Sequence, residues 1–162
     1  MNTEIEHIPL TRSSPSMRQI LIVDDDATSA LITQRGLQAR LGAQAEVHIA
    51  SSAHLAWRCC ACEHVDLLIV DPHPGQQLLM ALIRAVHTTL PHIIVLVLTA
   101  YDTPRLRAEM RALEMRYYFA KPIELMYLVH GVCLALGLDV ADDRAAGDSR
   151  AAHMPALPAK QP

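Results

Sequence analysis

The chain alternates short, continuously apolar runs with longer segments whose apolar residues recur every three or four positions. Four apolar runs stand out: Ile20–Val23, Leu67–Val70, Ile93–Leu98 and Tyr117–Ala120. Runs of this length, rich in Ile and Val, are typical of strands buried on both faces of a parallel sheet. A fifth run, Ala45–Ile49, alternates polar and apolar residues, which predicts a strand at the edge of the sheet.

The segments between these runs have the periodicity of amphipathic helices. Three of them carry clear apolar stripes, namely Leu79, Leu82, Ile83 and Val86; Leu106, Met110 and Leu113; and Leu125, Leu128, Val129, Val132 and Leu136. The stripe from Thr28 to Leu41 is weaker. Gly42 and Gly137 stand where helices commonly end with a left-handed residue. Five β-α units follow one another, which predicts one α/β domain in three layers.

Both ends of the chain differ from this middle part. Residues 1–18 contain Pro9, Pro15 and a serine-rich stretch, which is typical of a flexible leader. Residues 139–162 consist mostly of Ala, Asp, Arg and Pro, which predicts a disordered Ala/Pro-rich tail. We therefore expect one folded domain over residues 19–138 of the 162-residue chain.

Composition and charge exclude several classes of protein. Hydrophobic residues make up 51% of the chain, which is enough for a core, and the formal net charge of −3 offers no basic footprint for nucleic acid. No apolar run reaches the ~18–20 residues of a membrane span. The N-terminus carries Glu4, Glu6 and His7 in place of the apolar core of a signal peptide. We expect a cytoplasmic protein that binds neither nucleic acid nor membrane.

The four cysteines are expected to be reduced in that compartment; they are Cys59, Cys60, Cys62 and Cys133. The first three form a cluster with His54 and His64 nearby, which invites a metal-site interpretation. The cluster lacks the usual Cys-x-x-Cys spacing. Cys59 and Cys60 fall on the apolar side of a short helical pattern, which favours a role as small hydrophobic residues.

Polar residues follow four of the predicted strands at the point where each strand ends. They are Asp24–Asp26, Asp71–Gly75, Thr99–Tyr101 and Lys121–Pro122, and Lys121 is one of two lysines in the chain. Each has an ordinary structural explanation on its own, such as a helix cap for Asp26. Because ligands of open parallel sheets bind outside the carboxyl ends of the strands, their convergence on one edge indicates a functional site.

The chemistry of this edge is that of phosphoryl groups. Crowded carboxylates repel one another unless a cation relieves them, and Mg²⁺ prefers carboxylates, a carbonyl and retained waters. A lysine and a hydroxyl nearby would bind phosphoryl oxygens. A carboxylate beside such a metal can act as a nucleophile and form an aspartyl phosphate.

The ordered set of motifs carries a family resemblance. The segments Ile20–Asp26, Leu67–Asp71, Leu98–Ala100 and Lys121–Pro122 resemble, in order, the conserved strand ends of bacterial response-regulator receiver domains. The likeness covers about residues 19–138 and is greatest to single-domain, chemotaxis-regulator-like members. It implies a flavodoxin-like, doubly wound α/β fold with a parallel five-stranded sheet of order 2-1-3-4-5.

The resemblance also implies a metal and a phosphoacceptor. Asp24 and Asp25 would help to hold Mg²⁺, together with Asp71 and the backbone carbonyl of His73. Asp71 would accept a phosphoryl group from a sensor histidine kinase or a phosphotransfer protein. The protein would then be a phosphoacceptor and not an enzyme, with at most self-phosphorylation and self-dephosphorylation.

The same resemblance implies a switch and an output surface. Thr99 and Lys121 would stabilise the phosphoryl oxygens, and Thr99 would move together with the aromatic residue Tyr118. A packed edge-strand aromatic is the alternative interpretation of Tyr118. The output face would be built from the fourth helix, fifth strand and fifth helix, near Tyr117–Met126, for a downstream protein; homodimerisation is also compatible with it.

The chain departs from the family pattern after the phosphoacceptor. Asp71–Gln77 is one residue short before its Pro-Gly and lacks a later Asp-Gly, so the His73 carbonyl matches the ligand position only without a gap. The His73 side chain is interpreted as an ordinary loop histidine. Glu114-Met115 replaces a usual Gly-Ala pair. Tyr101 would place a ring where hydrolytic water must approach, which predicts slow dephosphorylation.

Two other functions are compatible with parts of the sequence. A degenerate receiver would keep the fold and act through partner binding without phosphorylation, as the altered loop after Asp71 suggests. A haloacid-dehalogenase-like phosphohydrolase would use Asp24 as nucleophile and Asp26 as general acid/base. In that reading the downstream acidic pair is Asp142-Asp143, which no convincing strand precedes, and Asp71 has no role.

Overall fold

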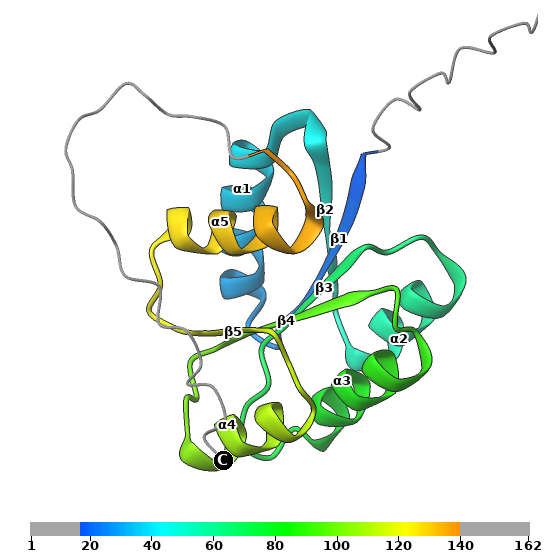
Figure 1. The fold of residues 1–162 in the computed structure, drawn as a ribbon, viewed down its shortest axis with the longest axis vertical. Helices are drawn as coiled ribbons and strands as arrows, with labels where there is room; N and C mark the ends of the chain where they lie inside the picture. The colour runs from blue at the N-terminus through cyan, green and yellow to red at the C-terminus, as the bar shows by residue number, and fades with distance from the viewer. Residues whose placement is uncertain (1–16, 140–162) are drawn as a thin grey trace, which may run out of the picture.

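A parallel sheet lies between two layers of helices in the computed structural model, which describes residues 17–139 (Figure 1). The strands are β1 (Arg18–Val23), β2 (Ala45–Ala50), β3 (Leu67–Val70), β4 (Ile94–Thr99) and β5 (Tyr117–Ala120). All neighbouring pairs are parallel, in the order β2-β1-β3-β4-β5. This confirms the predicted fold class and strand order.

Four helices connect the strands, a fifth follows the last strand, and together they cover both faces of the sheet. They are α1 (Ala27–Leu41), α2 (Ala53–Cys62), α3 (Gln77–Thr89), α4 (Pro104–Ala112) and α5 (Leu125–Leu136), with a short 3₁₀ turn, η1 (Gly42–Gln44), after α1. Helices α1 and α5 lie on one face, and α2, α3 and α4 on the other (Figure 1). Alternate residues of β1 enter the two cores, since Ile20 and Ile22 pack in one and Leu21 and Val23 in the other.

The ends of the helices follow from local sequence chemistry. The Asp26 side chain caps α1 by accepting hydrogen bonds from the N–H groups of Thr28 and Ser29. Gly42 and Gly137 end α1 and α5 with φ angles of 54° and 63°, a conformation in which a side chain is strained. Both glycine positions were expected from the sequence.

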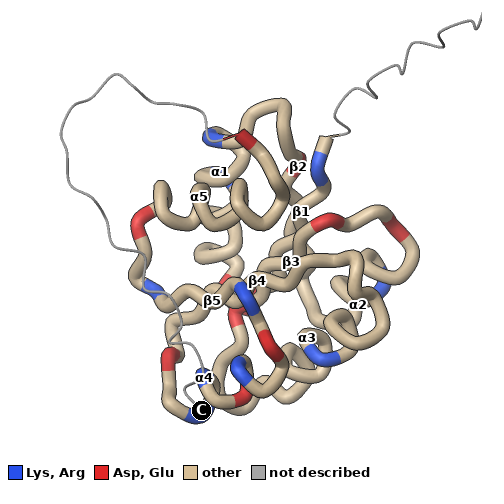
Figure 2. The backbone as a smooth tube through the Cα atoms, viewed as in Figure 1, with Lys and Arg blue, Asp and Glu red and all other residues tan. Residues whose placement is uncertain are grey.

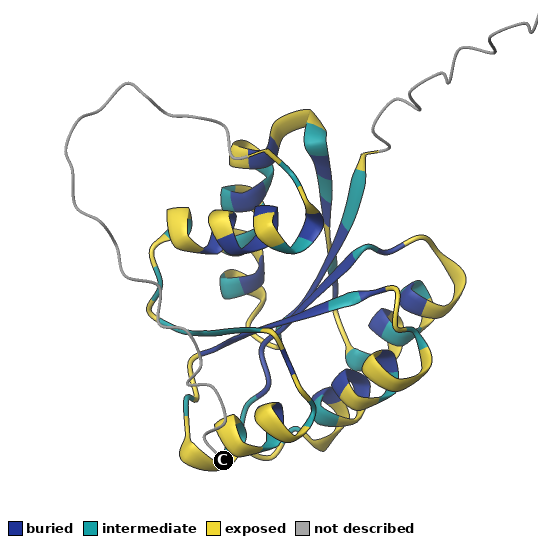
Figure 3. Ribbon diagram, viewed as in Figure 1, coloured by how far each residue is buried: buried dark blue, intermediate teal, exposed yellow. Residues whose placement is uncertain are grey.

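The bounds of β2 and β4 differ from the expectation by one residue, and β1 and β5 show the larger differences. Strand β1 begins at Arg18, inside the expected leader, because the Asp66 carboxylate binds the Arg18 guanidinium at 2.9 Å and the Gln19 N–H at 2.7 Å. Strand β5 was expected to be buried on both faces, and that prediction is wrong: as an edge strand it has four half-buried residues (Figure 3). The alternating strand β2 lies at the other edge, as expected.

The remaining sequence expectations fall partly outside the described residues. The predicted leader lies mainly in residues 1–16 and the predicted tail in residues 140–162, and neither range is among the described residues. Among residues 17–139 the structure has no helix with the length and apolar character of a membrane span.

All four cysteines are free, and Cys60 is buried while Cys59 packs against the same core. Over residues 17–139, no group of three His, Cys, Asp or Glu side chains is arranged to hold a metal.

Candidate functional site

The ends of β1, β3 and β5 meet at the ammonium group of Lys121. Lys121 Nζ donates hydrogen bonds to Asp71 Oδ2 at 2.7 Å, to Ser29 Oγ at 2.8 Å and to Asp24 Oδ2 at 3.1 Å. Its backbone N–H donates to the Thr99 carbonyl at 2.8 Å, across the end of β4, and its bond to Pro122 is cis. Charged residues are absent from β3, β4 and β5, and Asp71 and Lys121 directly follow two of these strands (Figure 2). The structure therefore brings three predicted site residues together.

Asp71 is the buried acid of this group, with 8% of its surface exposed. Its N–H donates to the Val23 carbonyl at 3.1 Å, which fixes the residue beside the end of β1. Lys121 binds its Oδ2, whereas its Oδ1 is buried and has no hydrogen-bond partner among the described residues. Burial opposes the charge of Lys121, but Asp71 and Asp24 outweigh it and raise the pKa of the ammonium. One carboxylate oxygen is thus paired with the Lys121 ammonium, and the other has no partner among the described residues.

The three consecutive acids have three different partners. Asp24 binds Lys121 through Oδ2 and accepts a hydrogen bond from the Asp26 N–H at 2.9 Å through Oδ1. Asp26 caps α1. Asp25 points to the loop between β3 and α3, where its Oδ2 lies 2.6 Å from His73 Nε2 and accepts a hydrogen bond of 2.9 Å from Gln76 Nε2. Asp24 and Asp71 therefore share one cation, and Asp25 does not contact it.

His73 takes a larger part in the site than its sequence position indicated. Its Nδ1 faces the Pro74 carbonyl at 3.0 Å and its Nε2 faces Asp25, so both ring nitrogens meet acceptors. The Pro74 carbonyl and, after it, the Asp25 carboxylate raise the pKa of the imidazole. The interpretation of an ordinary loop histidine did not anticipate this contact with Asp25. The carbonyl of His73, expected to face a metal, accepts a hydrogen bond of 3.1 Å from the Gln76 N–H.

Thr99 is fully buried at the end of β4 and bonds to the same loop. Its hydroxyl donates to the Pro72 carbonyl at 2.9 Å and accepts from the Tyr101 N–H at 3.0 Å. Neither bond involves Asp71. To reach a phosphoryl group on Asp71, the hydroxyl would have to leave the Pro72 carbonyl.

Tyr118 is hydrogen-bonded to the loop that follows β4. Its hydroxyl donates to Asp102 Oδ1 at 2.8 Å, and Asp102 also pairs with the Arg107 guanidinium. The Arg107 contact lowers the pKa of Asp102 to about 2, and burial together with Asp102 raises the pKa of Tyr118 to about 12. The ring packs against the core on the α3 side, so Tyr118 is at present a packed aromatic residue with a polar anchor.

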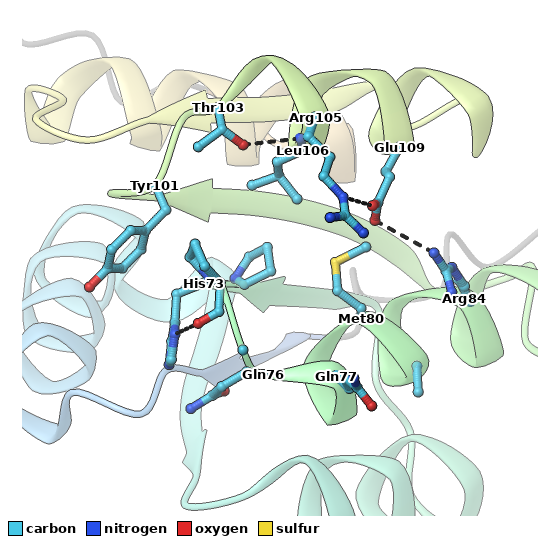
Figure 4. Close-up of a pocket in the computed structure, with 14 residues that line it drawn as sticks. His73, Gln76, Gln77, Met80, Arg84, Tyr101, Thr103, Arg105, Leu106 and Glu109 are labelled. Atoms are coloured by element: carbon cyan, nitrogen blue, oxygen red, sulfur yellow. Dashed lines mark hydrogen bonds and ion pairs between the residues drawn. The ribbon is translucent and has the colours of Figure 1, made fainter.

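A cleft of about 680 Å³ opens beside the site, between the β3-α3 loop, α3 and α4 (Figure 4). His73 and Tyr101 line it, and their rings lie 5.5 Å apart at an interplanar angle of 44°. Arg84 and Arg105 both pair with Glu109 at its other side. His73 therefore contacts both Tyr101 in this cleft and Asp25 among the acidic residues.

Sequence reasoning missed three residues of the site: Ser29, Gln76 and Asp102. Ser29 lies in the first turn of α1 and therefore at the same edge of the sheet as Asp24. Asp102 follows Thr99 by three residues and belongs to the same loop. Their positions were available from the predicted topology, but nothing in the residue pattern indicated which side chains they contact.

This geometry defines a class of protein: a parallel α/β domain with acids after two strands, a hydroxyl after a third and a lysine after a fourth. Residues 20–132 match the model of the response regulator receiver domain family. The chain belongs to that family. Membership argues against the phosphohydrolase alternative, as does the use of the Asp26 carboxylate as a helix cap.

Solved structures with the same fold support this assignment. A receiver domain of an HD domain-containing protein from Pseudomonas fluorescens Pf-5 is 26% identical, with a TM-score of 0.65, and the match covers 75% of this chain and 95% of that one. A response regulator from Thermotoga maritima is 25% identical, with a TM-score of 0.65, covering 75% and 98%. A CheY-like receiver domain protein from Methanospirillum hungatei JF-1 shares the fold at 24% identity and a TM-score of 0.66, covering 75% and 95%. The comparison with curated proteins finds no match.

Proposed function

We propose that this receiver domain is phosphorylated on Asp71 and passes the signal on through protein contacts. The observation that carries the proposal is the state of the Asp71 carboxylate: one oxygen is bound by Lys121, and the other is buried without a partner among the described residues. A buried oxygen without a hydrogen-bond partner costs free energy, so its presence in a fold calls for an explanation such as a functional role. A phosphoryl group or a metal on Oδ1 would supply the missing partner.

Mg²⁺ fits the donor chemistry of the site. Asp24 and Asp71 already lie within bonding distance of one cation, the Lys121 ammonium, so this position accepts positive charge. Asp24, Asp25 and Asp71 would hold the metal, with the His73 carbonyl as a further oxygen ligand. When bound, the metal neutralises charge on the phosphoryl oxygens. For Asp25 to take part, its carboxylate must first leave His73 and Gln76.

The residues of this chain then have distinct tasks in the transfer. Oδ1 of Asp71 attacks the phosphorus of a phosphohistidine on a histidine kinase or phosphotransfer protein. The P–N bond breaks, its electron pair stays on the imidazole nitrogen, and an acyl phosphate remains on Asp71. Lys121 binds a phosphoryl oxygen, and the Thr99 hydroxyl can do so once it releases the Pro72 carbonyl.

The output would follow from the movement of Thr99. The β4-α4 loop carries both the Tyr101 N–H, bonded to Thr99, and Asp102, bonded to Tyr118. A shift of the hydroxyl toward Asp71 therefore acts on the segment that holds Tyr118. The face built from α4, β5 and α5 would change shape, and a downstream protein or a second copy would bind it.

A degenerate receiver remains the second candidate because of one specific contact. Asp25 is bound by His73 and Gln76, so the β3-α3 loop occupies a carboxylate that a metal needs. If these bonds are stable against Mg²⁺, the domain would keep its fold and act by partner binding alone.

Labelling with a small phosphodonor distinguishes these functions. Wild type and Asp71→Asn are incubated with radiolabelled phosphoramidate and Mg²⁺, and the modified residue is located by mass spectrometry. We expect label on Asp71 in wild type and none in the variant. Equal labelling of both proteins would contradict the phosphoacceptor assignment, label on Asp24 would indicate the phosphohydrolase, and no label on either would favour the degenerate receiver.

A further inference from the structure

The hydroxyl of Ser29 is a neutral group inside a charged site. It accepts a hydrogen bond of 2.8 Å from Lys121 Nζ, whose other two bonds go to Asp71 and Asp24. An ammonium group has three N–H donors. Each donor of Lys121 therefore has one acceptor, and Ser29 is the uncharged acceptor of the three.

The two charged acceptors change when the proposed site works. A metal would take up part of the charge of Asp24, and phosphorylation converts the Asp71 carboxylate into an acyl phosphate with less charge on Oδ2. Both changes weaken the hold on Lys121 at the moment when the lysine must bind a phosphoryl oxygen. Ser29 takes part in neither step, so its bond to the ammonium is the one that stays the same.

The backbone around Ser29 is well suited to hold the hydroxyl in place. Ser29 belongs to the first turn of α1, and its own N–H donates to Asp26 Oδ1 at 3.2 Å. The neighbouring Thr28 N–H donates to the same oxygen at 2.9 Å. The cap ties this turn to the segment directly after β1, so the hydroxyl is presented by a helix and not by a mobile loop.

We propose that Ser29 is a positioning residue for phosphoryl transfer: its hydroxyl keeps Lys121 Nζ beside Asp71 while the two carboxylates change partners. The inference rests on the proposed function of Asp71 as phosphoacceptor. It adds a residue to the site that acts on the reaction through Lys121 and does not touch the phosphoryl group itself.

The kinetic test compares Ser29→Ala with Ser29→Thr, which retains the hydroxyl. The matched control is Thr28→Ala, which removes an exposed hydroxyl one residue away. With phosphoramidate as donor and Mg²⁺ both at saturation, we expect the phosphorylation rate of Ser29→Ala to fall about tenfold, the size of one hydrogen bond to a charged group. Ser29→Thr should regain most of the rate, and Thr28→Ala should match wild type.

Folding loss would not explain such a result, because alanine is a better helix former than serine. Thermal denaturation of each variant checks this directly. A fall in rate at saturating donor, with an unchanged Mg²⁺ dependence and an unchanged melting temperature, separates positioning from a structural role. An unchanged rate in Ser29→Ala would overturn the proposal.

A second readout does not need phosphorylation. The chain has only two lysines, Lys121 and Lys160, so ¹⁵N-lysine labelling yields two ammonium signals, and Lys160→Arg assigns them. We expect slow proton exchange for Lys121 in wild type, retained when Mg²⁺ is added, and several-fold faster exchange in Ser29→Ala. Equal exchange rates in both proteins would overturn the proposed role of Ser29 in holding the Lys121 ammonium. Failure of wild type to accept phosphate, with this exchange difference intact, would instead reject the proposed function.

Discussion

Two halves of the site lie side by side on one edge of the sheet and are held in different ways. The strand half consists of Asp24, Asp71 and Lys121, each the first residue after a strand. The loop half consists of His73, Gln76 and Tyr101, which lie in the β3-α3 and β4-α4 loops. Asp24 and Asp71 belong to one half and contact the same ammonium, while Asp25, next in sequence to Asp24, contacts the other half.

The strand half depends on the register of buried strands. Val23 pairs with Val70, so the acids that follow them start level with one another, and Ala120 pairs with Thr99, which brings Lys121 to the same edge. The loop half depends on hydrogen bonds made within a loop that contains Pro72, Pro74 and Gly75, the last with a φ of 94°. Strand register therefore places the two acids and the lysine, whereas hydrogen bonds of the loop place the residues that border them.

The largest effect is expected from the strand half. Lys121→Gln removes the cation that binds Asp71 and Asp24, so the phosphorylation rate should fall about 100-fold or more, as for loss of a group that stabilises transition-state charge. The measurement is initial labelling by phosphoramidate. Lys160→Gln, the change of the other lysine, is the control and should label at the wild-type rate. Retention of more than half the rate in Lys121→Gln would place the reactive centre elsewhere.

An intermediate effect is expected at Asp25, because the loop half and a Mg²⁺ ion bound beside the strand half would compete for its carboxylate. His73→Ala frees this carboxylate from one of its two loop partners, so Mg²⁺ no longer has to displace the ring. We expect the Mg²⁺ affinity to rise about fivefold, because a binding-competent state that is populated in advance reduces the apparent dissociation constant.

Isothermal titration with Mg²⁺ measures this change at one fixed pH. His87→Ala, which removes an exposed histidine on α3, is the matched control and should leave the affinity unchanged. Weaker Mg²⁺ binding by His73→Ala would mean that the histidine supports the metal site and does not compete with the metal for Asp25.

A smaller effect is expected on the lifetime of the phosphorylated state. The Tyr101 ring lies 5.5 Å from the His73 ring, centroid to centroid, and we expect it to limit the approach of water to an acyl phosphate on Asp71. Tyr101→Ala should lose its label about threefold faster than wild type, a small change because the ring only restricts access. The exposed Tyr127 on α5 provides the control variant, Tyr127→Ala. Equal decay of all three proteins would contradict the predicted slow dephosphorylation.

The same contrast explains what could be predicted from the sequence. The runs Leu67–Val70 and Tyr117–Ala120 match their strands at both ends, because a continuous apolar run bounded by polar residues marks the extent of a strand in this sheet. The half-buried state of β5 was missed because its apolar residues resemble those of a central strand, although the family resemblance already implied its edge position. Asp71 and Lys121 followed from their places after strands.

Individual side-chain contacts of the site could not be predicted in this way. The contact between His73 and Asp25 joins residues 48 positions apart, and that between Lys121 and Ser29 joins residues 92 apart. Both depend on the direction of a side chain and not on strand order. His73 was therefore taken for an ordinary loop residue, and Ser29 was not singled out.

The smallest effect on the chemistry is expected at Asp102, which connects the β4-α4 loop to Tyr118 without touching the strand half. Asp102→Asn removes one of the causes that raise the pKa of Tyr118 to about 12, while burial of the ring, the larger cause, remains. The phenol of the variant should therefore titrate below about 12 but above its ordinary value of 10.

A raised pKa means that the fold favours the neutral phenol. The free energy of unfolding therefore falls as the pH rises from the ordinary pKa to the folded value, and this fall should be smaller in Asp102→Asn because its Tyr118 pKa is raised less. Phenolate absorbance, with Tyr118→Phe to identify the residue among four tyrosines, measures the pKa. The labelling rate on Asp71 should match wild type. An unchanged Tyr118 pKa would show that Asp102 does not hold this ring, and a changed labelling rate would show that the loop acts on the strand half before phosphorylation.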